Sequence, residues 1–326
     1  MSPLAHGAAY GAVIVTVLLT IVALTIWFER KLAGRMQSRL GPTMVGPIGL
    51  LQPIADVLKL LQKEDIIPTD ADRGLFNVAP VLAVLVSLGA AAVVPFSPST
   101  IAADLDVGVL YVLAIGGVMV IPTFAAGWGS NNKFALLGAM RGVAQSVSYG
   151  VPLVLATLVP VILAGTLSLS GIVTWQSHHH WIAVWPVIPG LPAFFVFFLA
   201  LLAESNRIPF DIPEAESELV AGVTTEYTGA KFTLFYMGEY LHTLVGSAVA
   251  ATLFFGGWDG PFAPGLPWMV GKTLVLFATV YWVRWSLLRF RADQLMELCW
   301  KRLTPLAVAL VLLAAAWVQF GPGGSE

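Results

Sequence analysis

Long uncharged apolar runs alternate with shorter polar segments along the whole chain. A helix needs roughly 20 mainly apolar residues to cross the hydrocarbon core of a bilayer. The runs lack the strict alternation of apolar and polar residues that a membrane β-barrel requires. The pattern therefore predicts an all-α integral membrane protein with about eight spans, at residues 9–28, 75–95, 108–127, 144–168, 187–203, 234–257, 268–283 and 304–320.

The composition supports this fold class. Of the 326 residues, 57% are hydrophobic and 11% are charged, whereas a soluble globular domain carries about 25% charged residues. The formal net charge of -2 gives no reason to expect a nucleic-acid partner. The amino-terminal residues MSPLAHGAAY lack the basic region of a cleaved signal peptide, so the first run is expected to be a mature span. Since no repeat or low-complexity linker divides the chain, we expect one membrane domain over residues 1–326.

Basic residues divide unequally between the two sides that the spans define. One side would hold sixteen of the seventeen Lys and Arg residues, with Lys272 on the other. That side comprises the connections at 29–74, 128–143, 204–233 and 284–303. Because cytoplasmic loops carry the excess of Lys and Arg, this side is predicted to be cytoplasmic and both termini to lie outside.

Side chains that could hold a metal or cluster are scarce. Cys299 is the lone cysteine, which excludes a disulfide framework and any cluster or zinc site that needs several thiolates. The run His178–His180 falls on the outer side, and a solvated loop is the preferred interpretation because adjacent side chains do not converge on one ion. With no nucleotide fingerprint or P-loop either, we expect no metal, flavin, iron–sulfur or NAD site in this chain.

The first cytoplasmic connection, ERKLAGRMQSRLGPTMVGPIGLLQPIADVLKLLQKED, begins with two helix breaks, at Gly41-Pro42 and Gly46-Pro47. Apolar residues then recur at helical spacing from Leu50 to Leu61. The opposite face carries Gln52, Asp56, Lys59 and Lys63. This amphipathic helix could lie on the lipid headgroups, or it could wall a cavity between the membrane and a cytoplasmic partner.

The segment AESNRIPFDIPEAESELVAGVTTEYTG at 203–229 concentrates carboxylates around one cation, Arg207. It holds six of the nineteen acidic residues of the chain: Glu204, Asp211, Glu214, Glu216, Glu218 and Glu226. Glu214 and Glu218 are four residues apart, so they would share a face on a helix. Carboxylates crowded away from bulk water bind protons more tightly and titrate as a coupled set. The segment is therefore either a solvated acidic loop, free or paired with a partner's basic patch, or a proton reservoir.

A carboxylate within a predicted span favours the proton reservoir. Glu239 lies in FTLFYMGEYLHTLVGSAVAATLFF, and an ionisable residue inside a membrane helix is costly and marks a functional site. The same helical face carries Tyr236, Tyr240 and Thr243. Glu29 ends the first span, and a weaker polar stripe begins the fourth, at Gln145, Ser148 and Tyr149. We therefore expect a route for protons or ions from the acidic segment into the bilayer.

Several motifs together resemble one family, the H subunit of bacterial NADH–quinone oxidoreductase (respiratory complex I). The motifs are ERKLAGRMQSRLGPTMVGPIGLLQPIADVLKLLQKEDIIP, GWGSNNKFALLGAMRGVAQSVSY, AESNRIPFDIPEAESELVAGVTTEYTGAKFTLFYMGEY and RADQLMELCWKRLTPLA. The resemblance covers nearly the whole chain. It implies a membrane protein that forms part of a quinone chamber and carries a carboxylate proton route that couples quinone reduction to proton pumping.

The resemblance also implies roles for individual positions. The quinone-side residues would be Arg30, Lys31, Arg39, Gly41, Pro42, Gly46, Gln52, Asp56 and Lys59. The proton-route residues would be Glu29, Arg141, Glu204, Arg207, Asp211, Glu214, Glu216, Glu218, Glu226 and Glu239, and Asn132 also matches a family position. The substrate would be ubiquinone or menaquinone. The partners would be hydrophilic-arm subunits next to the terminal iron–sulfur cluster, small membrane subunits and antiporter-like subunits, in the bacterial inner membrane.

The chain departs from the family pattern at two places. Where the family usually reads Gly-Pro-Asn-Arg-Val-Gly-Pro, this chain has Thr43 and Met44, so a cation beside the quinone path is missing. Where the family usually has a glutamate after Ser-Tyr in the fourth span, this chain has Gly150. One carboxylate of the implied route is therefore absent.

Two alternative functions remain open at this stage. Related membrane subunits anchor energy-converting hydrogenases, which need no quinone; the motif LLQPIADVLKLL favours the quinone enzyme. A stand-alone ion-coupled transporter is a different class. Transporters often contain inverted repeats and helices broken at the bilayer midplane, and the sequence has no such repeat.

Overall fold

The computed structural model describes residues 3–98, 100–179, 189–261 and 264–320. These residues form helices joined by turns, without a β-strand, which confirms the all-α prediction. The helices are α1 (Pro3–Met36), α2 (Gln52–Leu61), α3 (Arg73–Ala91), α4 (Gly108–Val118), α5 (Val120–Gly129), α6 (Lys133–Ala164), α7 (Leu169–His178), α9 (Gly190–Glu204), α10 (Glu216–Leu219), α11 (Gly229–Phe254), α12 (Leu266–Ser286), α13 (Ala292–Glu297) and α14 (Thr304–Phe320).

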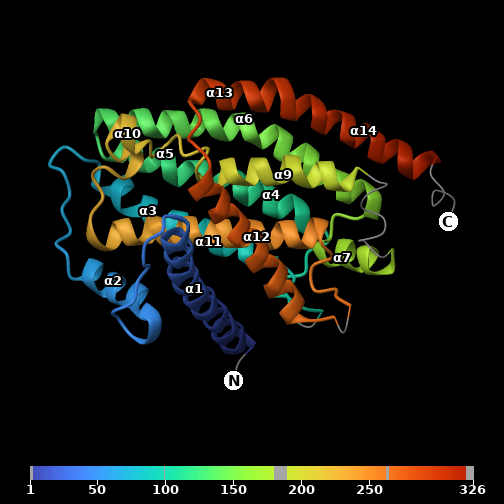
Figure 1. Ribbon diagram of the computed structural model, residues 1–326, viewed down its shortest axis with the longest axis horizontal. Helices are drawn as coiled ribbons and strands as arrows, with labels where there is room; N and C mark the ends of the chain where they lie inside the picture. Colours follow the sequence, from blue (N-terminus) through green and yellow to red (C-terminus); the bar gives the residue numbers. More distant parts are fainter. Residues whose placement is uncertain (1–2, 99, 180–188, 262–263, 321–326) are drawn as a thin grey trace.

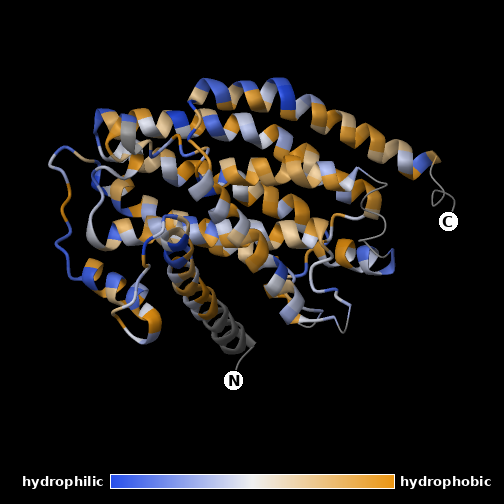
Figure 2. Cartoon of the chain, in the orientation of Figure 1, coloured by the Kyte–Doolittle hydropathy of each residue, from blue (hydrophilic) through white to orange (hydrophobic). Residues whose placement is uncertain are grey.

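The long helices run along the long axis of the molecule, and α1 and α12 cross them at a slant (Figure 1). Helix α11 packs against α3 and α12, while α6 packs against α5, α9 and α14. The short helices α2 and α10 lie at one end of the bundle and α7 lies at the other. Hydrophilic residues gather at the α2 end and on α13, whereas α4 and α9 are almost wholly apolar (Figure 2).

Five helices of the described residues are long and apolar enough to cross a membrane: Arg73–Ala91, Gly108–Gly129, Lys133–Ala164, Leu266–Ser286 and Ala292–Phe320. The other three predicted spans fall on α1, α9 and α11. Helix α9 has only 15 residues, and α11 carries Lys231 and Glu239. Among the described residues, length and hydropathy identify five of the eight spans that the sequence pattern predicts.

Capping and proline positions explain several helix boundaries. Asp72 Oδ1 accepts a hydrogen bond from Gly74 N at 2.9 Å and starts α3, and Asn132 Oδ1 accepts one from Phe134 N at 2.8 Å and starts α6. Pro122 divides the Gly108–Gly129 span into α4 and α5. A proline cannot donate to the carbonyl four residues earlier, so the helix breaks at Met119.

The acidic segment folds differently from the helical expectation. Glu214 precedes α10, which begins at Glu216, so the prediction that Glu214 and Glu218 share a helical face is wrong. The reason is a turn at Ala215, whose φ of 36° lies in the left-handed region. Gly222, with φ +53°, lies so close to the Pro213 carbonyl that a Cβ would overlap it, so the segment turns back on itself there.

The apolar core surrounds α9 and α11. It includes Phe197 and Leu201 from α9 and Leu241 and Phe254 from α11, each at most 3% exposed. Polar groups on these two helices therefore lie in a medium of low dielectric constant, where an unpaired charge is costly.

Candidate functional site

An open cavity of about 630 Å³ lies between α1, the connection that follows it, α11 and α12. Five of the nine predicted quinone-side residues line it: Arg30, Arg39, Gly41, Pro42 and Gln52. Thr43 and Met44, the positions that depart from the family pattern, also line it. The two helix breaks make this shape possible, because Gly49, at φ +77°, packs so tightly on the Pro42 carbonyl that no side chain would fit.

The other four quinone-side residues do not line the cavity. Asp56 contacts its wall, because its carboxylate accepts from Arg30 Nη1 at 2.5 Å and from Gln52 Nε2 at 2.9 Å. Lys31 Nζ lies 6.0 Å from the centre of the Trp27 ring. Gly46 forms a turn at φ 72°, and Lys59 is exposed in the last turn of α2.

The cavity is also lined by a buried carboxylate, Glu29, which lies near the C-terminal end of α1 and is 4% exposed. Arg284 Nη1 donates to Glu29 Oε1 at 2.7 Å, and the Tyr240 hydroxyl donates to Glu29 Oε2. Tyr236 extends the cluster, since its hydroxyl lies 3.1 Å from that of Tyr240. Both oxygens of the buried carboxylate are thus paired, which offsets the cost of removing its charge from water.

Arg207 connects this cluster to Glu239 on α11. Its guanidinium, 2% exposed, lies 4.6 Å from the Tyr240 ring centre and 5.6 Å from that of Tyr281. Its Nη2 is 3.3 Å from Glu239 Oε2. Cations over aromatic faces are attracted by the ring quadrupole. Arg207 therefore interacts with Tyr240, Tyr281 and Glu239 at the same time.

Two carboxyls of the acidic segment, Asp211 and Glu214, have a raised pKa. Burial raises the pKa of Glu214 well above its ordinary value, and the charge of Glu239 and a hydrogen bond to it raise it further. Burial also raises the pKa of Asp211 to about 7, with a further contribution from Glu214 and opposition from three nearby arginines. These two groups behave as the crowding argument predicts.

The remaining carboxylates of the segment behave differently. The expectation of raised proton affinity is wrong for Glu218, because Arg141 Nη1 donates to it at 2.5 Å and lowers its pKa. Glu226 Oε1 accepts from Asn132 Nδ2 at 2.5 Å. The side chain of Glu216 lies outside the described part of the chain. The segment therefore has two largely buried carboxyls, Asp211 and Glu214, and two others that bind the beginning of α6, Glu218 to Arg141 and Glu226 to Asn132.

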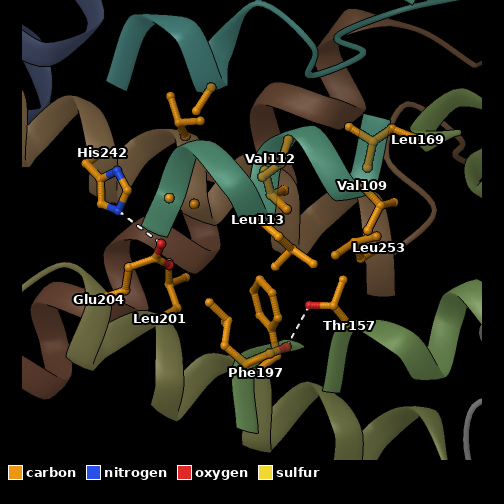
Figure 3. Close-up of a pocket in the computed structure, with 16 residues that line it drawn as sticks. Val109, Val112, Leu113, Thr157, Leu169, Phe197, Leu201, Glu204, His242 and Leu253 are labelled. Atoms are coloured by element: carbon orange, nitrogen blue, oxygen red, sulfur yellow. Dashed lines mark hydrogen bonds and ion pairs between the residues drawn. The ribbon is translucent and has the colours of Figure 1, made fainter. Parts of the chain in front are cut away.

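Glu204 lies apart from this cluster and faces a histidine (Figure 3). Its Oε1 is 3.5 Å from His242 Nε2, and the side chains are 10% and 7% exposed. Sequence reasoning missed His242, although it stands three residues after Glu239 on the same helical face. It also counted Arg284 only as a cytoplasmic cation and did not pair it with Glu29.

The polar stripe of α6 is an anchor for the backbone of the acidic segment. Gln145 Nε2 donates to the Ala203 carbonyl at 2.6 Å and to the Phe210 carbonyl at 2.9 Å.

The predicted histidine run lies at the end of α7. His179 stacks on Trp175 with ring centres 4.6 Å apart, while His180 lies outside the described residues. No group of three or more His, Cys, Asp or Glu side chains suited to a metal ion occurs among the residues that the structure describes.

The fold and the cavity define a multi-pass membrane protein with an open polar cavity beside a buried network of charged groups. Comparison with known families is specific: a family model described as NADH dehydrogenase matches residues 10–315. The chain belongs to this family, which includes the H subunits of NADH–quinone oxidoreductases.

Curated relatives agree over most of their length. The chain is 48% identical over 313 residues to the H subunit of the NADH-quinone oxidoreductase of Dehalococcoides mccartyi, covering 96% of this chain and 86% of the relative. The H subunit of Anaeromyxobacter dehalogenans is 46% identical (91% and 78% covered), and that of Paraburkholderia xenovorans is 45% identical (94% and 90%). The chain is thus a membrane subunit of the complex I type, and it acts with other subunits of the enzyme.

Proposed function

We propose that the cavity beside α1 is part of the quinone-binding chamber of the assembled enzyme. The observation that carries this proposal is the convergence of the first cytoplasmic connection and the Glu29 cluster on one cavity of about 630 Å³. That volume is within the range of about 300–1,000 Å³ for sites of small organic ligands. Arg284 lines the cavity and has guanidinium N–H donors besides the one on Glu29, and such donors suit a carbonyl oxygen of a quinone. Tyr236 and Tyr240 also line the cavity, and their hydroxyls would have to exchange their present partners to bind a quinone.

The same cluster supports a role in proton transfer. A quinone takes up two protons with its two electrons, and the electrons arrive from partner subunits. The charge of a bound reduced quinone would act on Glu29 and, through Arg207, on Glu239, Glu214 and Asp211. Coupled carboxyls respond to such a charge by changing their proton occupancy. The proton route proposed here therefore begins at the cavity and runs into the acidic segment.

The setting of the protein follows from the same proposal. The chain would form a single domain in the bacterial inner membrane, with both termini outside, as the distribution of basic residues supports. The cavity side would face hydrophilic-arm subunits that carry the last iron–sulfur cluster. Small membrane subunits and antiporter-like subunits would receive the proton route. The names of the relatives favour this enzyme over a hydrogenase anchor or a stand-alone transporter.

The quinone assignment is tested by comparing two basic residues of the same connection. Arg39 lines the cavity, whereas Lys59 does not. In the enzyme assembled from the native operon, Arg39→Ala should raise the KM for quinone about tenfold, the effect of losing about 1.4 kcal/mol of binding free energy. Lys59→Ala should leave it unchanged. An unchanged KM in Arg39→Ala, or equal shifts in both variants, would contradict the assignment.

A further inference from the structure

Glu204 lines two small, partly open spaces at the end of α9. One is a cavity of about 30 Å³ between α4, α6, α9 and α11, and the other is a space of about 10 Å³ beside Tyr149 and Asn206. A buried water needs about 10–15 Å³ of such volume. The first cavity therefore has room for water, and the carboxyl of Glu204 is in contact with both spaces.

The first cavity has ionisable side chains at one end only, and the hydroxyl of Thr157, toward the other end, donates to the Leu153 carbonyl (Figure 3). Its lining consists of apolar side chains and glycines apart from Thr157, Glu204 and His242. Glu204 and His242 meet at one end, and Leu169 and Leu253 lie toward the other (Figure 3). Because a buried water needs two to four polar partners, hydration of the cavity would begin at the Glu204–His242 end.

His242 is buried without a hydrogen-bond partner. Its side chain is 7% exposed, and neither ring nitrogen has a partner among the residues described. Nε2 faces Glu204 and the second nitrogen points away from it (Figure 3). A buried polar group of this kind requires an explanation. An imidazole can take up a proton at one nitrogen and release one from the other.

The pair continues the line of charged groups along α11. His242 follows Glu239 by three residues, so it lies on the same face and about 4.5 Å further along the helix axis. Glu239 contacts Arg207, and Glu204 precedes Arg207 by three residues. The Glu204–His242 pair therefore lies about one helical turn beyond the Glu239 cluster, further along α11 from the acidic segment.

We propose that His242 is a proton-transfer residue that works with Glu204 and extends the route beyond Glu239. The inference rests on the proposed function, because protons must first reach the acidic cluster. A proton on Glu204 Oε1 moves to His242 Nε2; one O–H bond breaks and one N–H bond forms, leaving a carboxylate and an imidazolium. The imidazolium then releases its Nδ1 proton to water in the cavity and becomes neutral. The groups that face this step are Glu204 itself, Tyr149 on its other side and Glu239 one turn away.

Helix α4 sets the position of the Glu204 carboxyl through Gly116. A Cβ at Gly116 would overlap Glu204 Oε1, whereas a Cβ at the next residue, Gly117, would have no neighbour within 4 Å. Gly116→Ala should therefore displace the carboxyl while leaving His242 in place. Gly117→Ala makes the same chemical change on the same helix without touching it, and is the matched control.

The test uses the complete enzyme, expressed from its operon and reconstituted in proteoliposomes, with assembly checked on native gels. His242→Gln keeps hydrogen-bonding groups and removes titration. It should lower proton-pumping turnover by up to about a hundredfold, the lower end of what a positioned proton-transfer group contributes. The KM for quinone should not change. Gly116→Ala should lower the proton-pumping turnover in the same way, and Gly117→Ala should leave it unchanged.

The outcomes separate this inference from the quinone assignment. If Arg39→Ala raises the KM but His242→Gln pumps at the original rate, the relay is wrong and the quinone site stands. If His242→Gln slows pumping but cavity variants leave the KM unchanged, the relay stands and the quinone site is wrong. If His242→Gln does not assemble, the Gly116→Ala and Gly117→Ala pair decides: equal pumping in the two overturns the proposal.

Discussion

Glu29 and Arg284 form an ion pair across 255 positions of sequence, with Arg284 Nη1 donating to Glu29 Oε1 at 2.7 Å. The pair joins α1 to α12 beside the open cavity, and Tyr240 from α11 completes it. Helix α1 therefore meets α11 and α12, which are distant from it in sequence, at one carboxylate. The contacts of Glu29 with Arg284 and Tyr240 therefore shape the cavity and form the start of the proposed proton route.

Removing one charge of the Glu29–Arg284 pair should destabilise the assembled enzyme more than removing both charges. Arg284→Met leaves the buried Glu29 with the Tyr240 hydrogen bond but without its ion-pair partner, and breaking a buried ion pair in this way typically costs about 3–5 kcal/mol. The double variant Glu29→Gln, Arg284→Met removes the charge as well and should recover part of that loss. The measurement is the thermal inactivation of the assembled enzyme for the single variants and the double variant. Strictly additive effects would show that the two side chains are not coupled.

The raised pKa of Asp211 predicts a specific pH dependence. Folding raises this pKa from its ordinary value to about 7, so between these values the folded protein binds more protons than the unfolded chain. Its contribution to stability is therefore present at low pH and is lost as the pH rises toward 7. Asp211→Asn should remove this dependence, as measured by thermal inactivation at a series of pH values.

A spectroscopic measurement checks the same proton directly. Below pH 7 the infrared spectrum should contain a protonated-carboxyl C=O band that disappears in Asp211→Asn. Glu218→Gln is the control, because the hydrogen bond from Arg141 lowers the pKa of Glu218 below its ordinary value. A band that persists in Asp211→Asn and titrates unchanged would assign the proton to another group.

Gln145 should matter through the backbone that it anchors. Gln145→Leu removes the side-chain hydrogen bonds to the Ala203 and Phe210 carbonyls, which keep only their backbone donors, and each lost hydrogen bond costs about 0.5–1.5 kcal/mol. Limited proteolysis of the assembled enzyme should then cut more rapidly within 205–228. Ser148→Ala, in the same stripe, removes only a bond to its own helix at Ala144 and should have a smaller effect.

Gly150 and Gly138 lie on the same helix and should respond oppositely to alanine. A Cβ at Gly150 meets nothing within 4 Å, whereas one at Gly138 would approach the Pro213 carbonyl oxygen to 2.6 Å. Gly150→Ala should stabilise the enzyme by about 0.5–1 kcal/mol, the helix-propensity difference. Gly138→Ala should lower the inactivation temperature by displacing the acidic segment. Destabilisation by Gly150→Ala would show that a partner protein fills the space.

The sequence predicted the all-α fold because hydrophobic runs identify helices, and the Gly-Pro pairs predicted the helix breaks that follow α1. The quinone-side residues came from the family resemblance, and five of the nine line the cavity. The acidic segment was recognised from its local sequence, although the turn at Ala215 prevented the expected helical pairing of Glu214 with Glu218.

What the sequence could not supply is the pairing between distant elements. The contact of Glu29 with Arg284 depends on how α1 and α12 cross, and that of Glu204 with His242 depends on the packing of α9 against α11. The opposite shifts in the pKa of Asp211 and Glu218 likewise depend on burial and on Arg141, which no spacing within the segment encodes.

The burial of Arg207 has a consequence for electroneutrality. A guanidinium does not give up its proton in a protein, so Arg207 and Arg284 supply two permanent positive charges to the cluster. Three carboxyls, Glu29, Glu239 and Glu214, surround them. With all three carboxyls ionised the cluster would carry a net charge of -1, and one bound proton would make it neutral. A negative charge arriving in the cavity would therefore favour the uptake of a further proton.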